Sequence, residues 1–445
     1  MLPPAHDWST GKKGTFGVAD YAVFGGMLSA SLAIGVYYAF RGRNKANDEF
    51  LLGGRSLTWF PASMSLLASY VSAILVLGAP SEAYYHSIQW LVICGGQISL
   101  PIVAIVFLPL YYELQLTSVY EYLELRYNSR WIRSVAGGMF VIQMLLYEAV
   151  VIYAPALALS SVFDFPLWIS VITVGLIASV YTAIGGMKAV VWTDVMQLTI
   201  LTVGLVAVIL KGVVDFGGFG EIWRVAVDHD RAGPGAFTFG YRPFQRHTIS
   251  NIVLGGIVNK MSQYAATQTT VQRYGSMKSL YHAYMSIFMV VPIFIILHTL
   301  TMITGLVLFA TYEGCDPLAA GLITKRDQIL PFYVMDRLSS IPGLPGLFVA
   351  CIFSGALRSE LTGGGDVGGR VRSHTQLCPP CPTTQAWLTK LLALSYGFLG
   401  MGLAFLADNI GGILQGGTAV TTSVAGPLLA VFVMAFFIPF SNSKV

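Results

Sequence analysis

The sequence predicts an all-α membrane protein whose helices cross the bilayer many times. Hydrophobic residues make up 55% of the 445 residues and charged residues only 11%, whereas a soluble domain carries about 25% charged residues. The mean hydropathy is +0.67, and the apolar residues form long continuous runs. Such runs are typical of membrane helices, because the strands of membrane barrels are short and alternate apolar with polar residues.

Each crossing of the bilayer needs about 20 mostly apolar residues. Eleven runs are candidates, and the ninth is too short to cross alone. The candidate spans are Val18–Phe40, Leu57–Gly78, Ile88–Tyr111, Ser134–Leu159, Leu167–Ile184, Val190–Val213, Thr248–Tyr264, Tyr284–Phe309, Leu344–Leu357, Leu388–Leu406 and Ile410–Pro439.

Lysine and arginine in the short links between spans predict the orientation. They gather in the links after the first, third, fifth and seventh spans, whereas Ala79–Ser87 and Val162–Pro166 contain none. Because basic links favour the cytoplasmic side, we expect residues 1–16 outside the cell and a transmembrane domain over residues 17–440. The net charge of +4 is spread over many loops, so nothing indicates nucleic-acid binding.

Two of the spans are interrupted by polar residues. The second contains Pro61 and a small, polar run over residues 68–73, and the seventh contains a polar run over residues 259–264. Unwound backbone inside a membrane is tolerated only where it lines a cavity or is buried in protein. With the leading span set aside, these helices are the first and sixth of ten. Transporters with inverted repeats build a central site from such a pair, and two kinked helices in an ordinary bundle are the alternative.

Ordered motifs cover nearly the whole chain. They include "NDEFLLGGR" from Asn47 to Arg55, then "YTAIGGMKAVVWTDVMQ", "QTTVQRY" and "PGLPGLFVACIFSGAL". Through these motifs the sequence resembles the solute:sodium symporter family, and within it the branch of sodium-coupled monocarboxylate, multivitamin and iodide transporters. The resemblance implies a LeuT-like 5+5 inverted repeat with one leading helix, located in the plasma membrane. That branch usually continues through two more spans, so residues 441–445 would be a truncated end.

The resemblance also implies two sodium sites, with sodium as the coupling ion and no other cofactor. Sodium is a hard cation and prefers oxygen ligands. One site would use the backbone carbonyls of Ala68 and Val71 and a pair of hydroxyls on the eighth core helix, of which only Ser359 is present. The other site would include Asp194, for which an ion pair with Lys188 or Arg273 is the alternative role. The residues that match the second site are Ser69, Asp194, Gln197 and Gln268.

The eighth core helix is predicted to be disrupted. After "SGAL" the family pattern continues as a helix rich in Ser and Thr, but here Arg358, Glu360 and a Gly-rich run follow. A charge at the bilayer centre costs roughly 2.5–3.5 kcal/mol. We therefore interpret residues 358–386 as a frame-shifted or mis-spliced segment, and a divergent cytoplasmic loop is the alternative. Cys378 and Cys381 lie in this segment at CxxC spacing, without the second pair of a zinc site.

Two charges inside the spans, Lys260 and Glu148, depart from the family pattern. Intramembrane charges usually face the bundle interior and pair. In one hypothesis Lys260 attracts a substrate carboxylate in a site that Tyr70 and Tyr264 share, with Tyr147 matching a family tyrosine near the substrate. In the other hypothesis Lys260 and Glu148 form a structural ion pair.

The predicted function is sodium-coupled import of small organic anions, with short monocarboxylates as the first choice. Biotin- or pantothenate-like vitamins and iodide are alternatives, and a non-transporting or defective membrane relative is an alternative of another class. The expected partners are the anion, sodium and the lipid bilayer. An enzyme is not expected, because the sequence contains no nucleophile elbow, metal-ligand cluster or phosphate-binding loop.

Overall fold

The computed structural model confirms the all-α prediction. Apart from one bridge between Leu57 and Met277, every regular element among the described residues is a helix. Ser359, Cys378 and Cys381 lie outside the described residues. The described residues are 16–41, 55–114, 118–163, 165–184, 187–240, 245, 247–356, 382–407 and 412–442.

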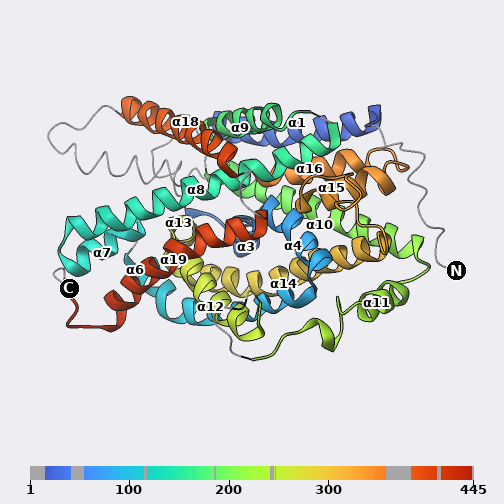
Figure 1. Cartoon of the computed structure of the whole chain (residues 1–445). Helices are drawn as coiled ribbons and strands as arrows, with labels where there is room; N and C mark the ends of the chain where they lie inside the picture. Colours follow the sequence, from blue (N-terminus) through green and yellow to red (C-terminus); the bar gives the residue numbers. More distant parts are fainter. Residues whose placement is uncertain are drawn as a thin grey trace.

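Several helices run alongside one another down the long direction of the molecule (Figure 1). Within the described part of the chain, five helical stretches are long and apolar enough to cross a membrane, or six if the bent pair α3 and α4 counts as one span. The five are Ile88–Leu114, α8 (Arg130–Phe163), the Val190–Asp215 part of α10 (Met187–Asp215), α14 (Leu280–Thr311) and α19 (Ile413–Phe437). Helices α1 (Val18–Arg41), α9 (Leu167–Ile184), α16 (Leu344–Ala356) and α18 (Pro382–Ala407) contain shorter apolar stretches.

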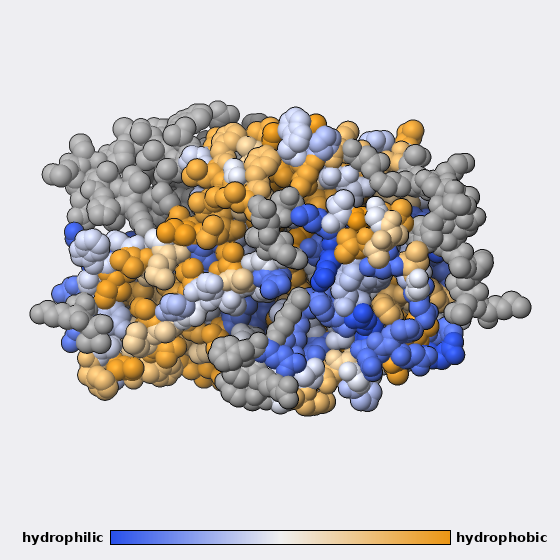
Figure 2. Space-filling model, viewed as in Figure 1, coloured by the Kyte–Doolittle hydropathy of each residue, from blue (hydrophilic) through white to orange (hydrophobic). Residues whose placement is uncertain are grey.

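The outer surface of the helices suits contact with lipid. Large apolar side chains such as Trp131, Ile105 and Leu210 are exposed, and Figure 2 shows apolar residues over much of one face. Soluble monomers rarely expose contiguous apolar patches of more than a few hundred Å². The exposed apolar side chains therefore support the multi-span prediction.

The helices pack as two groups joined by α10 and α19. In one group α3 (Trp59–Ala68), α4 (Ala73–Tyr85) and α12 (Ile249–Ala265) pack with α14 and the 88–114 stretch, and in the other α8, α9, α16 and α18 pack together. Helix α10 contacts α3, α14 and α16, while α19 contacts α4, α8 and α12 (Figure 1). Each repeat contributes its first two helices to the first group, so the interrupted pair lies in one bundle.

The predicted interruption of the first core helix is confirmed. Helix α3 ends at Ala68 and α4 begins at Ala73, and the two are bent by 61°. The amides of Tyr70 and Val71 both donate to the Leu67 carbonyl, which closes a tight turn. Ser72 then caps the N-terminus of α4, since its hydroxyl accepts a hydrogen bond from the Ile74 amide at 3.3 Å. This is the usual way to satisfy a free amide at a helix N-terminus.

The predicted interruption of the sixth core helix was misplaced. Helix α12 runs without a break through Lys260 and ends at Ala265, and α13 (Gln268–Gly275) follows after Ala266 and Thr267. Thr267 is extended, with φ −99° and ψ 138°. The polar residues of the 259–264 run therefore project from an intact helix, and the unwound backbone begins just beyond them.

Four tyrosine hydroxyls stabilise this later break. A helix ends with carbonyls that have no partner within the helix. The carbonyls of residues 263, 264, 265 and 266 each accept a hydrogen bond from a tyrosine; Tyr274 belongs to α13, which follows the break, and the other three tyrosines lie far away in the sequence. The donors are Tyr70 at 2.6 Å, Tyr274 at 3.1 Å, Tyr111 at 2.7 Å and Tyr120 at 3.4 Å.

Close helix packing depends on Gly96, which gives the first testable prediction. A Cβ added at Gly96 would lie 2.5 Å from the backbone of Gly256 in α12. Small residues at such contacts let membrane helices approach closely. We expect Gly96→Ala to destabilise the fold by about 1–3 kcal/mol through overpacking, measured by thermal unfolding in detergent.

The matched control is Gly255→Ala, on the same helix as Gly256. Nothing lies within 4 Å of a Cβ added there, and alanine favours a helix over glycine by about 0.8–1 kcal/mol. This variant should unfold at the same temperature as the wild type or above it. A Gly96→Ala variant as stable as Gly255→Ala would contradict the packing argument.

Candidate functional site

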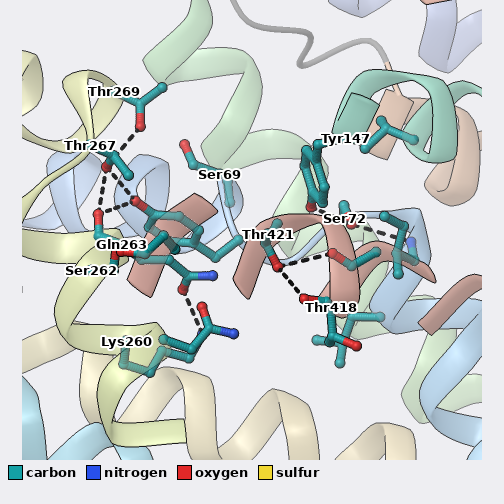
Figure 3. A pocket seen from close by; sticks show the side chains of 18 of the residues that line it. Ser69, Ser72, Tyr147, Lys260, Ser262, Gln263, Thr267, Thr269, Thr418 and Thr421 are labelled. Carbon is teal, nitrogen blue, oxygen red and sulfur yellow. Dashed lines mark hydrogen bonds between the residues drawn. The ribbon is translucent and has the colours of Figure 1, made fainter. Parts of the chain in front are cut away.

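A central cavity lies between the two groups of helices, and Figure 3 shows part of its polar lining. Its volume is about 180 Å³, and side chains from the α3–α4 break, α8, α12, α14 and α19 line it. Sites for drug-sized ligands have volumes of roughly 300–1,000 Å³. The cavity therefore suits a small solute, and both halves of the inverted repeat contribute to it.

Lys260 brings a positive charge to this cavity from α12. Its side chain lines the cavity and the residue is 6% exposed. The ammonium donates to Gln263 Oε1 at 3.0 Å and lies 4.4 Å from the ring centre of Phe294 and 5.7 Å from that of Tyr70. Aromatic faces attract a cation without neutralising it, so the charge remains available to an anion.

The proposed ion pair between Lys260 and Glu148 is not formed. Across the described ranges, no acidic side chain forms an ion pair with Lys260. Glu148 also lines the cavity, but its carboxyl faces Gly400 of α18, where an added Cβ would lie 3.1 Å from it. The pair hypothesis was wrong because the Glu148 side chain turns towards α18, while the Lys260 ammonium donates to Gln263.

The three predicted tyrosines differ in their relation to the cavity. Tyr70 and Tyr147 line it, and the Tyr147 hydroxyl donates to Ser72 Oγ at 3.2 Å (Figure 3). Tyr264 is fully buried behind Tyr70, with ring centres 4.9 Å apart, and is not part of the lining. The structure therefore brings Tyr70, Tyr147 and Lys260 together and leaves Tyr264 as a supporting residue.

Three further polar residues line the cavity: Asn259, which belongs to the polar run at 259–264, and Gln143 and His298, which were not anticipated from the sequence. Each has a buried polar atom that finds no hydrogen-bond partner in the described part of the chain, namely Gln143 Oε1, Asn259 Oδ1 and His298 Nδ1. Buried polar groups are usually hydrogen-bonded. His298 could have been found as an ionisable residue in an apolar span, which is a functional candidate by default.

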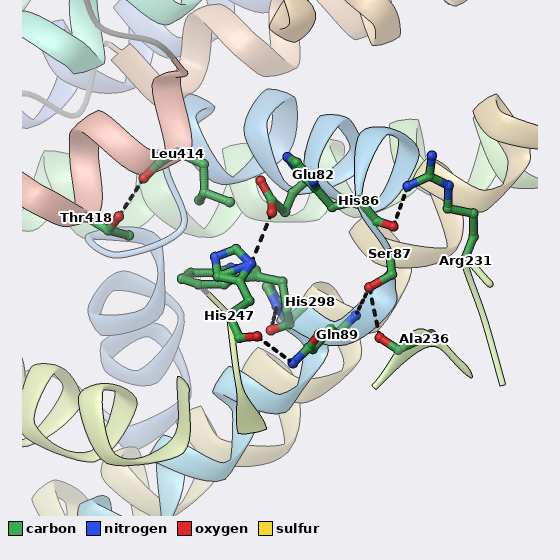
Figure 4. Close-up of polar contacts among 11 residues, drawn as sticks. Glu82, His86, Ser87, Gln89, Arg231, Ala236, His247, His298, Leu414 and Thr418 are labelled. Carbon is green, nitrogen blue, oxygen red and sulfur yellow. Dashed lines mark hydrogen bonds and ion pairs between the residues drawn. The ribbon is translucent and has the colours of Figure 1, made fainter. Parts of the chain in front are cut away.

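His298 lies near the place where the segment before α12 meets α4 (Figure 4). There His247 Nδ1 lies 3.2 Å from Glu82 Oε1 of α4. The His247 carbonyl accepts a hydrogen bond from Gln89 Nε2 at 3.2 Å. The imidazole ring of His247 packs on the Trp90 ring, with ring centres 5.1 Å apart. Since Trp90 lines the cavity, these contacts help to fix this part of its wall.

The first predicted sodium position lies at the α3–α4 break. Ala68 lines the cavity, and both Ala68 and Val71 are buried in the turn that links the two helices. Ser359, the predicted hydroxyl ligand, lies outside the described residues, and the described part of α16 ends at Ala356.

The second predicted sodium position is a buried polar cluster. Ser65 of α3 donates to Asp194 Oδ2 at 2.6 Å and accepts Arg273 Nε at 2.9 Å. Arg273 Nη2 lies 3.8 Å from the same carboxylate oxygen, so the ion pair with Arg273 given above as the alternative for Asp194 is present. Of the three residues predicted here with Asp194, Ser69 donates through Oγ to the Ser65 carbonyl, Gln268 accepts the Val119 amide through Oε1, and Gln197 is buried.

Residues 50–444 match the sodium:solute symporter family. The chain is 40% identical to the human sodium-coupled monocarboxylate transporter 1, over 97% of this chain and 71% of that protein. It is also 40% identical to the sodium-dependent multivitamin transporter of Oryctolagus cuniculus, over 96% and 68%, and 37% identical to the human sodium/iodide cotransporter, over 98% and 68%.

Among solved structures, the chain resembles the substrate-bound, outward-open state of a Na⁺-coupled sialic acid symporter. The TM-score is 0.86 at 24% identity, covering 96% of this chain and 89% of that one. The likeness confirms the predicted LeuT-like fold. The family match, the identity to the named relatives and the likeness of fold each cover nearly the whole sequence. The chain therefore belongs to the sodium:solute symporter family.

Proposed function

We propose that this chain imports small organic anions together with sodium, and that short monocarboxylates are its leading substrates. The observation that carries this proposal is the position of Lys260, a buried ammonium that lines the central cavity beside two aromatic rings. A carboxylate bound there would form a charge-assisted hydrogen bond, which is about twice as strong as a neutral one. The relatives named as monocarboxylate transporters support the same class.

Sodium would bind next to the substrate at the α3–α4 break. The carbonyls of Ala68 and Val71 and the hydroxyl of Ser359 would be its ligands, since unwound backbone in such transporters coordinates cations. A second sodium would use Asp194 with Ser69, Gln197 and Gln268. The contact between Asp194 and Arg273 makes a structural role for this carboxylate the competing explanation.

Alternating access would follow from the two groups of helices. The bundle that contains α3, α4, α12 and α14 would rock against the group of α8, α9, α16 and α18, exposing the cavity to each side in turn. We place the protein in the plasma membrane with its N-terminus outside, because the basic links then face the cytoplasm. Each net positive charge moved inward gains about 2.3 kcal/mol per 100 mV of inside-negative membrane potential, so two sodium ions with one monocarboxylate anion would carry one such charge.

Reconstituted vesicles test the proposal. We expect purified protein in proteoliposomes to accumulate labelled butyrate above its external concentration when sodium is imposed outside. Replacement of sodium by choline should abolish accumulation, and an inside-negative potential should increase it. A channel-like relative would only equilibrate the acid, and the absence of sodium-dependent uptake for every anion in a panel of monocarboxylates, biotin, pantothenate and iodide would contradict symport.

A further inference from the structure

Helix α11 (Phe219–Asp228) lies in the long segment between α10 and α12. Three of its apolar side chains, Ile222, Val225 and Ala226, are buried. Intervals of three and four positions from Ile222 place them on one face of the helix, and α11 packs against α14. This face is the part of α11 that the protein itself covers.

A second apolar stripe runs beside the buried face and is exposed. Phe219, Trp223 and Val227 follow one another at intervals of four positions, so they line one side of the helix. Their side chains are 40%, 40% and 36% exposed. Phe219 and Trp223 lie three positions before Ile222 and Ala226, so the stripe borders the buried face. The apolar surface of α11 is therefore wider than the part that the protein covers.

The remaining side of α11 is polar. Glu221 and Arg224 form an ion pair there, and Asp228 is exposed. A helix with a charged face opposite an apolar face that carries Trp and Phe is typical of helices that lie in a membrane interface. Helix α11 thus has three sides: one covered by protein, one polar, and one apolar and uncovered.

The link from α10 keeps α11 close to the end of that helix. Only residues 216–218 separate the two helices, and Gly217 and Gly218 turn the chain with φ values of 74° and 147°. Such values favour glycine. Four steps of the chain reach at most about 14 Å, so α11 begins close to the place where α10 ends (Figure 1).

The end of α10 faces lipid in the proposed transporter. Val203, Val206, Leu210 and Val214 are exposed and follow one another at helical spacing along one side of α10. The 190–215 stretch has 26 residues and is about 39 Å long, whereas the hydrocarbon core of a bilayer is about 30 Å thick. The end of α10 therefore reaches the headgroup level, and the stripe of α11 continues its apolar surface there.

We propose that α11 is an interfacial helix that binds the outer leaflet of the bilayer, with Phe219, Trp223 and Val227 among the lipids and with Glu221 and Arg224 in water. This inference rests on the proposed function, because such a transporter crosses a bilayer. Tryptophan is enriched at this depth of membrane proteins. A second copy of the chain fits less well, because three side chains offer far less than the roughly 800 Å² per partner that a stable interface buries.

Quenching of tryptophan emission tests the proposal with the full-length protein in proteoliposomes. The chain has 8 tryptophans, so the emission of Trp223 is measured as the difference between the wild type and Trp223→Phe. Interfacial helices bury their apolar face about 5–10 Å into the boundary between headgroups and acyl chains. Lipids brominated at the headgroup end of the acyl chains should therefore remove most of this emission, and lipids brominated near the methyl end should remove little.

Arg224→Trp is the matched control, because it adds an indole on the polar side of the same helix. Its extra emission over the wild type should be quenched by acrylamide in the water and not by brominated lipid. Phe219→Trp adds an indole to the apolar stripe one turn before Trp223 and should show the lipid quenching expected for Trp223. Neither variant depends on the folding of Trp223→Phe.

Two results would overturn the inference. In one, acrylamide quenches the stripe and brominated lipid does not; in the other, neither quencher reaches it, because protein covers it. Uptake and quenching are measured in the same vesicles. Sodium-dependent uptake of butyrate without lipid quenching of the stripe would overturn this inference alone, whereas lipid quenching without uptake of any anion would support it and contradict the proposed function.

Discussion

Lys260→Met is expected to raise the concentration of carboxylate needed for half-maximal uptake by about 10- to 100-fold. The substitution keeps the length of the side chain and removes the ammonium that faces the cavity. A hydrogen bond to a charged group contributes about 1.5–3 kcal/mol, which corresponds to this range of affinity. The measurement is the concentration dependence of sodium-driven uptake in proteoliposomes.

The fold should tolerate this substitution. No acidic side chain of the described residues pairs with Lys260, so Lys260→Met leaves no uncompensated charge behind. A structural pair would behave differently, because removal of one partner of a buried ion pair costs about 3–5 kcal/mol. Unchanged uptake kinetics in folded Lys260→Met would contradict substrate contact.

Lys278→Met is the matched control. This lysine is exposed and lies outside the cavity lining, and the substitution changes the net charge of the protein by the same amount. Exposed charges contribute little to stability or to binding at a distant, screened site. The control should therefore transport carboxylates with wild-type kinetics.

Asp194→Asn is expected to lower the free energy of unfolding by about 3–5 kcal/mol. Asp194 and Arg273 are 1% and 6% exposed, and both contact the hydroxyl of Ser65. Neutralising the carboxylate leaves the guanidinium buried without its counter-charge, which is the costly way to break such a pair. The measurement is thermal unfolding in detergent, supported by the yield of monodisperse protein.

The double variant Asp194→Asn/Arg273→Gln separates structural from sodium-binding roles. Removal of both charges should restore most of the stability, because neither remains uncompensated. If Asp194 is also a sodium ligand, as proposed, the sodium concentration for half-maximal uptake should rise by about tenfold with the loss of a charged contact. A wild-type sodium dependence in the double variant would exclude Asp194 as a ligand.

Asp215→Asn is the control for this experiment. Asp215 lies at the end of the same helix, α10, and pairs with Lys211 four residues before it. Both side chains are about a quarter exposed, and ion pairs near the surface contribute about 0–1 kcal/mol. A loss of stability in Asp215→Asn as large as in Asp194→Asn would show that burial is not the cause.

The long apolar helices and the family could be predicted from the sequence because both depend on local features. A membrane helix must be apolar over a continuous length and must satisfy its backbone internally, so Arg130–Phe163 and Leu280–Thr311 appear in the sequence as long apolar runs. The α3–α4 break could be placed for a related reason. Residues 69–72, between Ala68 and Ala73, have lower helix propensities than alanine, and Ser72 provides a local cap.

The break in the sixth core helix was decided by the tertiary structure. Polar residues at 259–264 suggested local unwinding, but the helix continues to Ala265 and ends where tyrosines from other helices meet its carbonyls. An unwound backbone inside a membrane is stable only where distant groups satisfy it. Three of the tyrosines, Tyr70, Tyr111 and Tyr120, are more than 140 positions along the chain from the carbonyls to which they donate.

The sequence alone therefore determined which segments form long apolar helices, the family, and the presence of Lys260 in a candidate site. Only the tertiary structure decided how the charges are partnered: Glu148 faces α18, Arg273 reaches Asp194, and Lys260 stays without an acidic partner among the described residues. The physical reason is distance. Apolar length is encoded along the chain, whereas an ion pair or an unpaired acceptor depends on how helices far apart in the sequence are packed together.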